Sequence, residues 1–289
     1  ANPETTTTTL SFRRYRDGDT EIESFRDKIF QAGHTHKCPT YVQSTPPCQG
    51  SCPSGEDIRG YLAVVRQTEK PPAGPDGKPI SWQEYAWRRL TAANPFPSVM
   101  GRVCPAPCET GCNRNEVEDH VGINSVEHFL GEYAIANKLA FVKPEMRSGK
   151  KVAVLGGGPA GLSCAYQLAL KGHDVTIFDE HDRLGGMMRY GIPGFRTPRD
   201  VLDAEIQRIL DLGVQARMNC RVGRDVSMED IRRDFDAVFL GLGAQAGRAL
   251  PIKDGDAPNV VTATAFLRAF NDGRLQHEVH FARSAAHLE

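Results

Sequence analysis

The feature that most constrains the fold is a glycine-rich turn between an apolar run and a helical pattern. Residues 151–155 form a short valine-rich run, typical of a strand buried in a parallel sheet. The turn 156–161 follows at once, and residues 162–169 place apolar side chains at helical spacing. Gly172 ends this predicted helix, and a second apolar run follows at 175–178. This order predicts a β-α-β unit and therefore a parallel sheet.

The same turn indicates a ligand. Gly156, Gly158 and Gly161 match the pattern G-x-G-x-x-G, which lets a backbone approach a pyrophosphate and directs helix N–H groups at its charge. Asp179 ends the second strand, where a carboxylate accepts hydrogen bonds from ribose hydroxyls. The alternative is a glycine turn without a ligand. The surrounding strand, helix, strand and acid favour a dinucleotide site over it.

A second glycine pair, Gly185 and Gly186, follows the acid. With the first loop it resembles the FAD site of flavoproteins with two dinucleotide domains more than a simple NAD site. The resemblance implies that the pair lets the backbone pass the flavin-side phosphate and ribitol. Further along, residues 198–213 predict a helix with Leu202, Ile206 and Ile209 inside, and residues 236–240 predict a strand.

Six of the eight cysteines lie close together in the first 112 residues. They are Cys38, Cys48, Cys52, Cys104, Cys108 and Cys112. The prolines that follow Cys52 and Cys104 remove a backbone N–H and stiffen loops of the kind that hold an iron–sulfur cluster. Zinc and unliganded thiols are the alternatives. Zinc favours two-residue gaps, and six cysteines do not divide into sets of four, so the spacing favours iron–sulfur clusters. We expect Cys164 and Cys220 to be small core residues.

The region around these cysteines reads as short helices joined by loops. Apolar side chains recur at helical spacing in residues 57–66, 82–90 and 124–138. In the last of these, the residues expected to face a core are Val126, Phe129, Leu130 and Tyr133.

Charge and hydropathy exclude several kinds of partner. The 35 basic and 36 acidic side chains leave a formal net charge of −1, which gives no attractive field for nucleic acid or anionic lipid. No apolar run reaches the roughly 20 residues of a bilayer helix, and the first residues carry no signal pattern. We expect a cytoplasmic protein that binds neither nucleic acid nor membrane.

Several motifs together carry a family resemblance. They are Pro47-Cys48-x3-Cys52-Pro53, Asn94-Pro-Phe-Pro97, Gly101-Arg-Val-Cys-Pro105, Cys108-Glu-x-x-Cys112, the glycine loop, Tyr190-Gly-Ile-Pro193 and Asp236-Ala-Val-Phe-Leu-Gly241. Over about residues 25–277 the chain resembles the small (β) subunit of NADPH-dependent glutamate synthase, a module that recurs in dihydropyrimidine dehydrogenase and in bifurcating ferredoxin-NADP oxidoreductases. Around Lys37-Cys-Pro39 and residues 52–60 it is most similar to the DsrL-type iron–sulfur flavoproteins of sulfur-oxidising bacteria.

The resemblance implies FAD, two 4Fe-4S clusters and, in the full-length protein, NAD(P)H. The ligands it implies for one cluster are Cys52, Cys104, Cys108 and, in place of a fourth cysteine, Glu127. For the other cluster it implies Cys38, Cys48 and Cys112 with an unknown fourth ligand, for which Thr45, His36, a water and an open iron site are candidates. The residues it implies for the dinucleotide are Gly156, Gly158, Pro159, Ala160, Gly161, Asp179, Gly185, Gly186, Arg189, Gly191, Ile192, Val222, Gly241 and Gly243.

The activity implied is that of an NAD(P)H-linked oxidoreductase, in which electrons pass between the flavin, the clusters and a redox partner protein. That partner would resemble either reverse dissimilatory sulfite reductase or the large subunit of glutamate synthase. No side chain is expected to do acid–base work, so no catalytic residue is predicted. A non-catalytic electron-transfer module and a zinc-stabilised dinucleotide-binding scaffold are the alternatives.

The predicted fold class is α+β, with a small helical iron–sulfur domain followed by a Rossmann-like (β/α) FAD-binding domain. We expect the first domain, with an extended lead, at residues 1–145 and the second at residues 146–289. The family's NAD(P)H domain is absent from this sequence, and the end beyond about residue 277 matches nothing in the family. We therefore expect a fragment that does not react with NAD(P)H by itself. A homodimer is one assembly that the sequence leaves open.

Overall fold

The computed structural model describes residues 45–74, 77–117, 119–244, 253, 257 and 260–274. The predicted lead segment, His36, Cys38 and the tail beyond residue 277 lie outside these residues. Contacts divide the chain into two compact units. The small unit comprises residues 1–55 and 107–121, and the large unit comprises residues 56–106 and 122–289. The domain boundary at residues 145 and 146 is a different division, drawn from sequence pattern, and stays a prediction.

The described part of the small unit consists of short helical elements. They are α3 (Pro47–Ser51), α7 (Pro107–Thr110) and the 3-10 helix η1 (Asn113–Glu116). Helices α3 and α7 pack against each other. The approach is close at Gly111, where an added Cβ would lie 2.7 Å from the Ser51 hydroxyl oxygen. Among the described residues of this unit only Cys108 is buried, so the unit has almost no apolar core of its own.

The large unit begins with helices that confirm the predicted ones at 57–66, 82–90 and 124–138. Their bounds are α4 (Ile58–Val65), α5 (Trp82–Thr91), α6 (Pro97–Val103) and α8 (Ile123–Ala136). The side chains of Asp57 and Ser81 accept hydrogen bonds from backbone N–H groups in the first turns of α4 and α5, which fixes where these helices start. Helices α6 and α8 touch through glycines: a Cβ at Gly131 would lie 2.3 Å from the Ser98 nitrogen.

Helix α8 buries only part of the predicted face, with Leu130 in the core as expected. Phe129 was expected in the core, but it is 50% exposed and stacks on Trp82, with 6.1 Å between ring centroids. The residues that α8 buries are Ile123, Glu127, Leu130, Gly131 and Ala134. The α6 backbone approaches at Gly131, so the stripe that contains this glycine turns inward.

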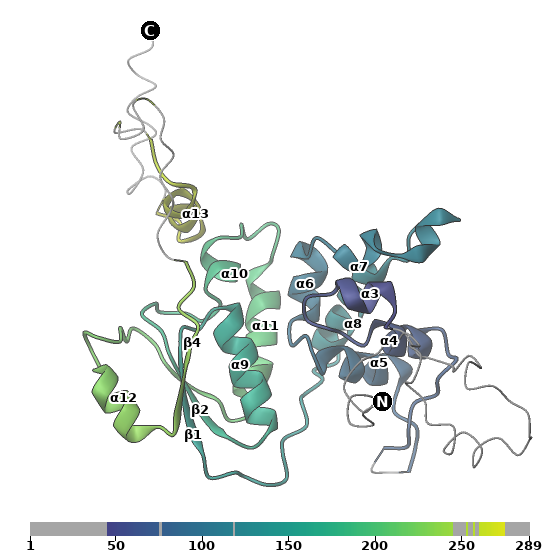
Figure 1. Ribbon diagram of the computed structural model, residues 1–289, viewed down its shortest axis with the longest axis horizontal. Coiled ribbons are helices and arrows are strands. Elements are labelled where there is room, and N and C mark those ends of the chain that lie inside the picture. The colour runs from purple at the N-terminus through teal and green to yellow at the C-terminus, as the bar shows by residue number, and fades with distance from the viewer. Residues whose placement is uncertain are drawn as a thin grey trace, which may run out of the picture. The chain divides into compact units, whose positions relative to one another are not determined.

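The rest of the large unit is a parallel sheet with helices on both faces. The strands, in the spatial order β3-β2-β1-β4, are β3 (Gln215–Arg217), β2 (Asp174–Phe178), β1 (Lys151–Leu155) and β4 (Ala237–Leu240). The helices are α9 (Pro159–Leu170), α10 (Met187–Tyr190), α11 (Arg199–Leu210), α12 (Met228–Asp234) and α13 (Ala263–Asn271). Figure 1 shows α9 and α11 on one side of the sheet and α12 on the other. The predicted β-α-β unit is confirmed, as is the helix from residue 198.

Strand β3 has no clear signal in the sequence, because it is three residues long and all three are exposed. Strand β4 is exposed along most of its length, and Leu240 is 60% exposed. By contrast, β1 is buried from Val152 to Leu155, as its valine-rich run predicts. Among the described residues, none of the helices has the length and apolar character needed to cross a membrane.

Candidate cofactor sites

The glycine loop lies where β1 ends and α9 begins. Gly156 has φ +107°, a left-handed conformation that favours glycine. A Cβ at Gly161 would lie 1.8 Å from the Gly156 carbonyl oxygen, so the first turn of α9 packs directly on the loop. Gly158 is the N-cap of α9, and Pro159 and Ala160 form its first turn. The N–H groups at this helix start are therefore available to an anion.

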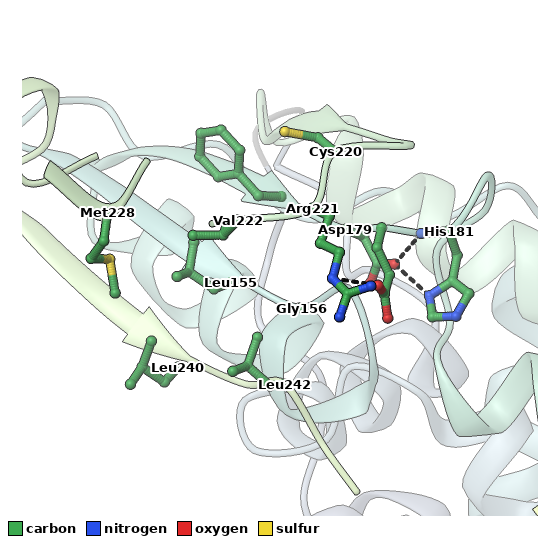
Figure 2. Close-up of a pocket in the computed structure, with 12 residues that line it drawn as sticks. Leu155, Gly156, Asp179, His181, Cys220, Arg221, Val222, Met228, Leu240 and Leu242 are labelled. Carbon is green, nitrogen blue, oxygen red and sulfur yellow. Dashed lines mark hydrogen bonds and ion pairs between the residues drawn. The ribbon is translucent and has the colours of Figure 1, made fainter. Parts of the chain in front are cut away.

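Asp179 follows β2 and faces this loop. Its side chain is buried, and its Oδ2 accepts the Gly157 N–H at 2.6 Å. Its Oδ1 accepts the His181 N–H at 2.8 Å and lies 2.7 Å from the His181 Nδ1 (Figure 2). The carboxylate thus fixes the loop and the turn after β2 together. The sequence analysis missed His181, although its place two residues after the acid could have indicated it.

The second glycine pair packs on the first loop. The Gly185 N–H donates to the Gly157 carbonyl at 2.8 Å, and a Cβ at Gly186 would lie 2.6 Å from the Gly158 Cα. Gly241 closes the other side, since a Cβ at Gly156 would lie 2.3 Å from the Gly241 carbonyl oxygen. The backbones of three separate segments of the sequence therefore meet at these glycines, where side chains would not fit.

The other predicted dinucleotide residues have different surroundings. Arg189 is buried, donates from Nε to the Leu184 carbonyl at 2.5 Å and pairs with Asp203. Gly191 and Ile192 follow α10, and the Ile192 carbonyl accepts a hydrogen bond from Arg199 at 2.7 Å. The two remaining positions, Gly243 with φ +67° and Val222, follow β4 and β3 respectively.

A pocket of about 420 Å³ opens beside Gly156 and Asp179 (Figure 2). Its apolar lining comes from Leu155, Phe178, Val222, Met228, Leu240 and Leu242. Polar groups gather at one end, where Arg221 lies 3.6 Å from the Glu180 carboxylate and His181 adjoins Asp179. An apolar pocket of this size with a few polar groups suits a flat aromatic ring joined to a ribose.

The small unit brings four of the predicted cluster cysteines onto two packed helices. Cys48 lies within α3 and Cys52 caps its end, donating its N–H to the Cys48 carbonyl at 3.2 Å. Cys108 lies within α7, and Cys112 directly precedes η1. None of the described cysteines forms a disulfide.

The large unit holds the other described ligand candidates. Cys104 ends α6, and its sulfur accepts the Ala106 N–H at 3.4 Å. Glu127, on α8, is buried and accepts a hydrogen bond from the Asn94 side-chain nitrogen at 2.9 Å. Burial, and next the neighbouring Glu127, raise the pKa of Glu56 to about 8. The sequence analysis missed Glu56 as a partner of Glu127.

The chemistry of these donors fits iron–sulfur clusters. Thiolates are their usual ligands, and N–H groups that donate to sulfur tune them. A unit whose described residues bury little besides a cysteine is also what a cluster-centred fold needs. Within the described ranges, however, no three His, Cys, Asp or Glu side chains are grouped as around a metal ion. The two ligand sets, including Glu127, therefore stay predictions.

Cys164 and Cys220 were expected in the core, and both are half-buried. Cys220 packs against the core cluster that includes Leu155 and Phe178 and also lines the pocket, whereas Cys164 lies on α9. The helical period around Cys164 places its side chain at the border of the buried face, next to Ala165.

Two family models match the chain. Residues 26–139 match the model described as dihydropyrimidine dehydrogenase domain II, 4Fe-4S cluster, and residues 154–217 match the NAD(P)-binding Rossmann-like domain. The predicted fold class is confirmed: a helical 4Fe-4S-type domain precedes a Rossmann-like dinucleotide-binding domain with a parallel sheet.

Three similar proteins show which members of this class the chain resembles. The chain is 39% identical over 223 residues to the glutamate synthase [NADPH] small chain of Mycobacterium tuberculosis, which covers 77% of this chain and 43% of the relative. It is 35% identical over 251 residues to the NADP(+)-dependent formate dehydrogenase subunit beta of Moorella thermoacetica, covering 78% of this chain and 34% of the relative. It is 36% identical over 219 residues to the NADPH-Fe(3+) oxidoreductase subunit beta of Geobacter sulfurreducens, covering 73% of this chain and 30% of the relative.

The chain is thus similar to the glutamate synthase small chain over about three quarters of its own length. It spans less than half the length of each of these relatives.

Proposed function

We propose that the chain is the FAD and iron–sulfur module of an NAD(P)H-linked oxidoreductase. The observation that carries the proposal is that one chain joins a cysteine-bearing helical domain to a glycine cradle faced by a buried acid. A dinucleotide site alone would suit many enzymes. Together with the cysteines, it favours an enzyme in which a flavin takes up an electron pair and passes the electrons singly to one-electron carriers.

FAD suits the cradle better than a nicotinamide dinucleotide. The second glycine pair, Gly185 and Gly186, packs on the first loop at Gly157 and Gly158, so two backbone segments without side chains adjoin the same space. Bound FAD would accept a hydride and release electrons singly. Asp179 would hold the adenosine ribose, and the start of α9 would face the pyrophosphate. The pocket beside Leu155 would exclude water from the adenine ring that is joined to this ribose.

For the clusters we keep the ligand sets that the resemblance implies. Cys52, Cys104, Cys108 and Glu127 would hold one 4Fe-4S cluster. Cys38, Cys48 and Cys112 would hold the other with a fourth ligand of another kind. The N–H that donates to the Cys104 sulfur supports these sets.

The partner that best suits the sequence is a redox protein of the reverse dissimilatory sulfite reductase type, because the cysteine spacing around residues 37–60 is most similar to DsrL-type flavoproteins. A glutamate synthase large subunit is the alternative. The printed names of the relatives, a small chain and two beta subunits, support assembly with another subunit.

The test is the composition of the chain purified without oxygen. We expect one FAD released on denaturation and identified by chromatography, with about eight iron and eight sulfide per chain. Zinc without iron would support the scaffold alternative, and a released NADP would overturn the assignment of the glycine loop to FAD.

A further inference from the structure

A fully buried carboxylate joins helix α11, which packs on α9 and through it on the sheet, to helix α6 of the large unit. Glu205, on α11, is 0% exposed. Its Oε1 accepts the Ser98 N–H at 2.8 Å, and its Oε2 accepts the Val99 N–H at 3.0 Å. These two N–H groups lie in the first turn of α6, where a helix has no internal partner for them. A side chain of α11 thus caps the start of α6.

One turn further along α11, Arg208 holds the chain just after α8. Its Nε donates to the Leu139 carbonyl at 2.8 Å. Its guanidinium lies over the rings of Trp87 and Phe141, 5.1 and 5.7 Å from their centroids. Since α6 and α8 also pack on each other, α11 contacts a helix pair that behaves as one piece.

The helices that α11 holds carry two of the predicted cluster ligands. Helix α6 is seven residues long and ends at Cys104, whose N–H donates to the Met100 carbonyl at 2.8 Å. Helix α8 carries Glu127. A short helix is rigid, so a shift of its first turn moves its last residue as well.

We propose that Glu205 is a positioning residue for electron transfer: by holding the first turn of α6, it fixes Cys104 relative to the dinucleotide-binding sheet. The inference rests on the proposed function, because Cys104 matters here as a cluster ligand.

The stability cost of this carboxylate supports a positioning role. Burial raises the pKa of Glu205 to about 7 from 4.5, although the N–H groups of Ser98 and Val99 lower it. The charged groups that face it are Arg208 on its own helix and Glu132 on α8, and α6 contributes backbone N–H groups. Between pH 4.5 and 7 the folded state holds a proton that the unfolded state has lost, so the free energy of unfolding falls as the pH rises through this window.

Above pH 7 the ionised acid therefore lowers stability, and a glutamine would avoid this effect. If residue 205 served only the stability of the fold, glutamine would suit this position better than glutamate above pH 7. The charged form has one advantage: both of its oxygens accept, so it holds two N–H groups at once, whereas a glutamine side chain offers one oxygen and an NH₂ group.

The test uses Glu205→Gln in the whole iron-loaded chain at about pH 8. We expect Ser98 and Val99 amides to exchange at least about tenfold faster, and the paramagnetic spectrum and midpoint potential of one cluster to change. Flavin potential and iron content should stay as in the parent, and the free energy of unfolding should not fall. Asp200→Asn is the control, because Asp200 is exposed on the first turn of the same helix. Glu205→Asp, which keeps the charge on a shorter side chain, should give a smaller change.

Identical cluster spectra and potentials in the parent and both Glu205 variants would overturn the inference, and so would a loss of stability with unchanged clusters. A parent chain without iron would instead overturn the proposed function. The two failures are therefore distinguishable.

Discussion

At the scale of single residues, Asp179 has two tasks. It fixes the Gly157 N–H and the turn at His181, and it is the group proposed to hold the ribose. We expect Asp179→Ala to weaken FAD binding by about 10- to 100-fold, which corresponds to about 1.5–3 kcal/mol for hydrogen bonds to a charged group. Flavin retained after dialysis measures this. Asp174→Ala is the control, since Asp174 begins the same strand at its other end. Full flavin occupancy in Asp179→Ala would contradict the assignment.

Glu127 is the residue whose role the sequence and the structure describe most differently. The resemblance predicts a cluster ligand, and the described residues show a buried carboxylate bonded to Asn94 beside Glu56, whose pKa is raised by its burial. We expect Glu127→Gln to keep the fold, because the amide can still accept from Asn94. If Glu127 is a ligand, the cluster potential rises, since a neutral oxygen replaces an anionic one.

Redox titration followed by paramagnetic resonance measures this shift. Glu145→Gln is the control, because Glu145 is exposed in the loop that follows α8. Titrations of Glu127→Gln that superimpose on the parent for both clusters would show that the carboxylate is only a buried structural group.

Individual residues could be predicted where local pattern decides their place. Asp179 follows a strand by a fixed offset, and the structure puts it against the loop. Glu205 could not be found this way, because its partners Ser98 and Val99 are 107 and 106 residues away in the sequence. Phe129 was placed wrongly because apolar spacing does not show which stripe a glycine contact will turn inward.

At the scale of elements, the turn from β1 to α9 depends on close packing without side chains. Helix propensity alone would make Gly161→Ala stabilising by up to about 1 kcal/mol. The added Cβ would lie 1.8 Å from the Gly156 carbonyl oxygen, so the loop must move. We expect a net loss of about 1–3 kcal/mol in the free energy of unfolding, together with loss of flavin.

Denaturant unfolding and flavin content measure the effect. Gly194→Ala is the matched control, because the nearest atom to its Cβ would be the Arg199 Nε at 4.0 Å and its φ is not left-handed. A Gly161→Ala chain as stable as the control, with its flavin, would mean that the loop can open without harm.

The helices of the small unit depend on something other than apolar packing. Among its described residues only Cys108, on α7, is buried. If the clusters take the place of a core, Cys108→Ser should lose iron and unfold this unit while the large unit stays folded. Iron analysis with amide exchange measures both. Cys164→Ser on α9 is the control, and unchanged iron in Cys108→Ser would contradict the ligand set.

At the scale of the whole molecule, the fold class was predictable because its strongest signals are local. The glycine loop fixes the parallel sheet, and the cysteine loops fix a helical region before it. The division into compact units was not predictable, since residues 107–121 group with residues before 56 only through contacts between distant segments. Nor was the exposed edge strand β4 foreseen from its apolar sequence.

The most direct test of the account is whether electrons pass between the flavin and the clusters of one chain. The bound flavin would be reduced by light under anaerobic conditions with EDTA as the sacrificial electron donor. The reduction is followed at about 450 nm, and samples are frozen for paramagnetic resonance. The account predicts that reduced-cluster signals grow as the flavin is reduced, at a rate independent of protein concentration. An iron-loaded chain whose flavin is fully reduced while no cluster signal grows would contradict it.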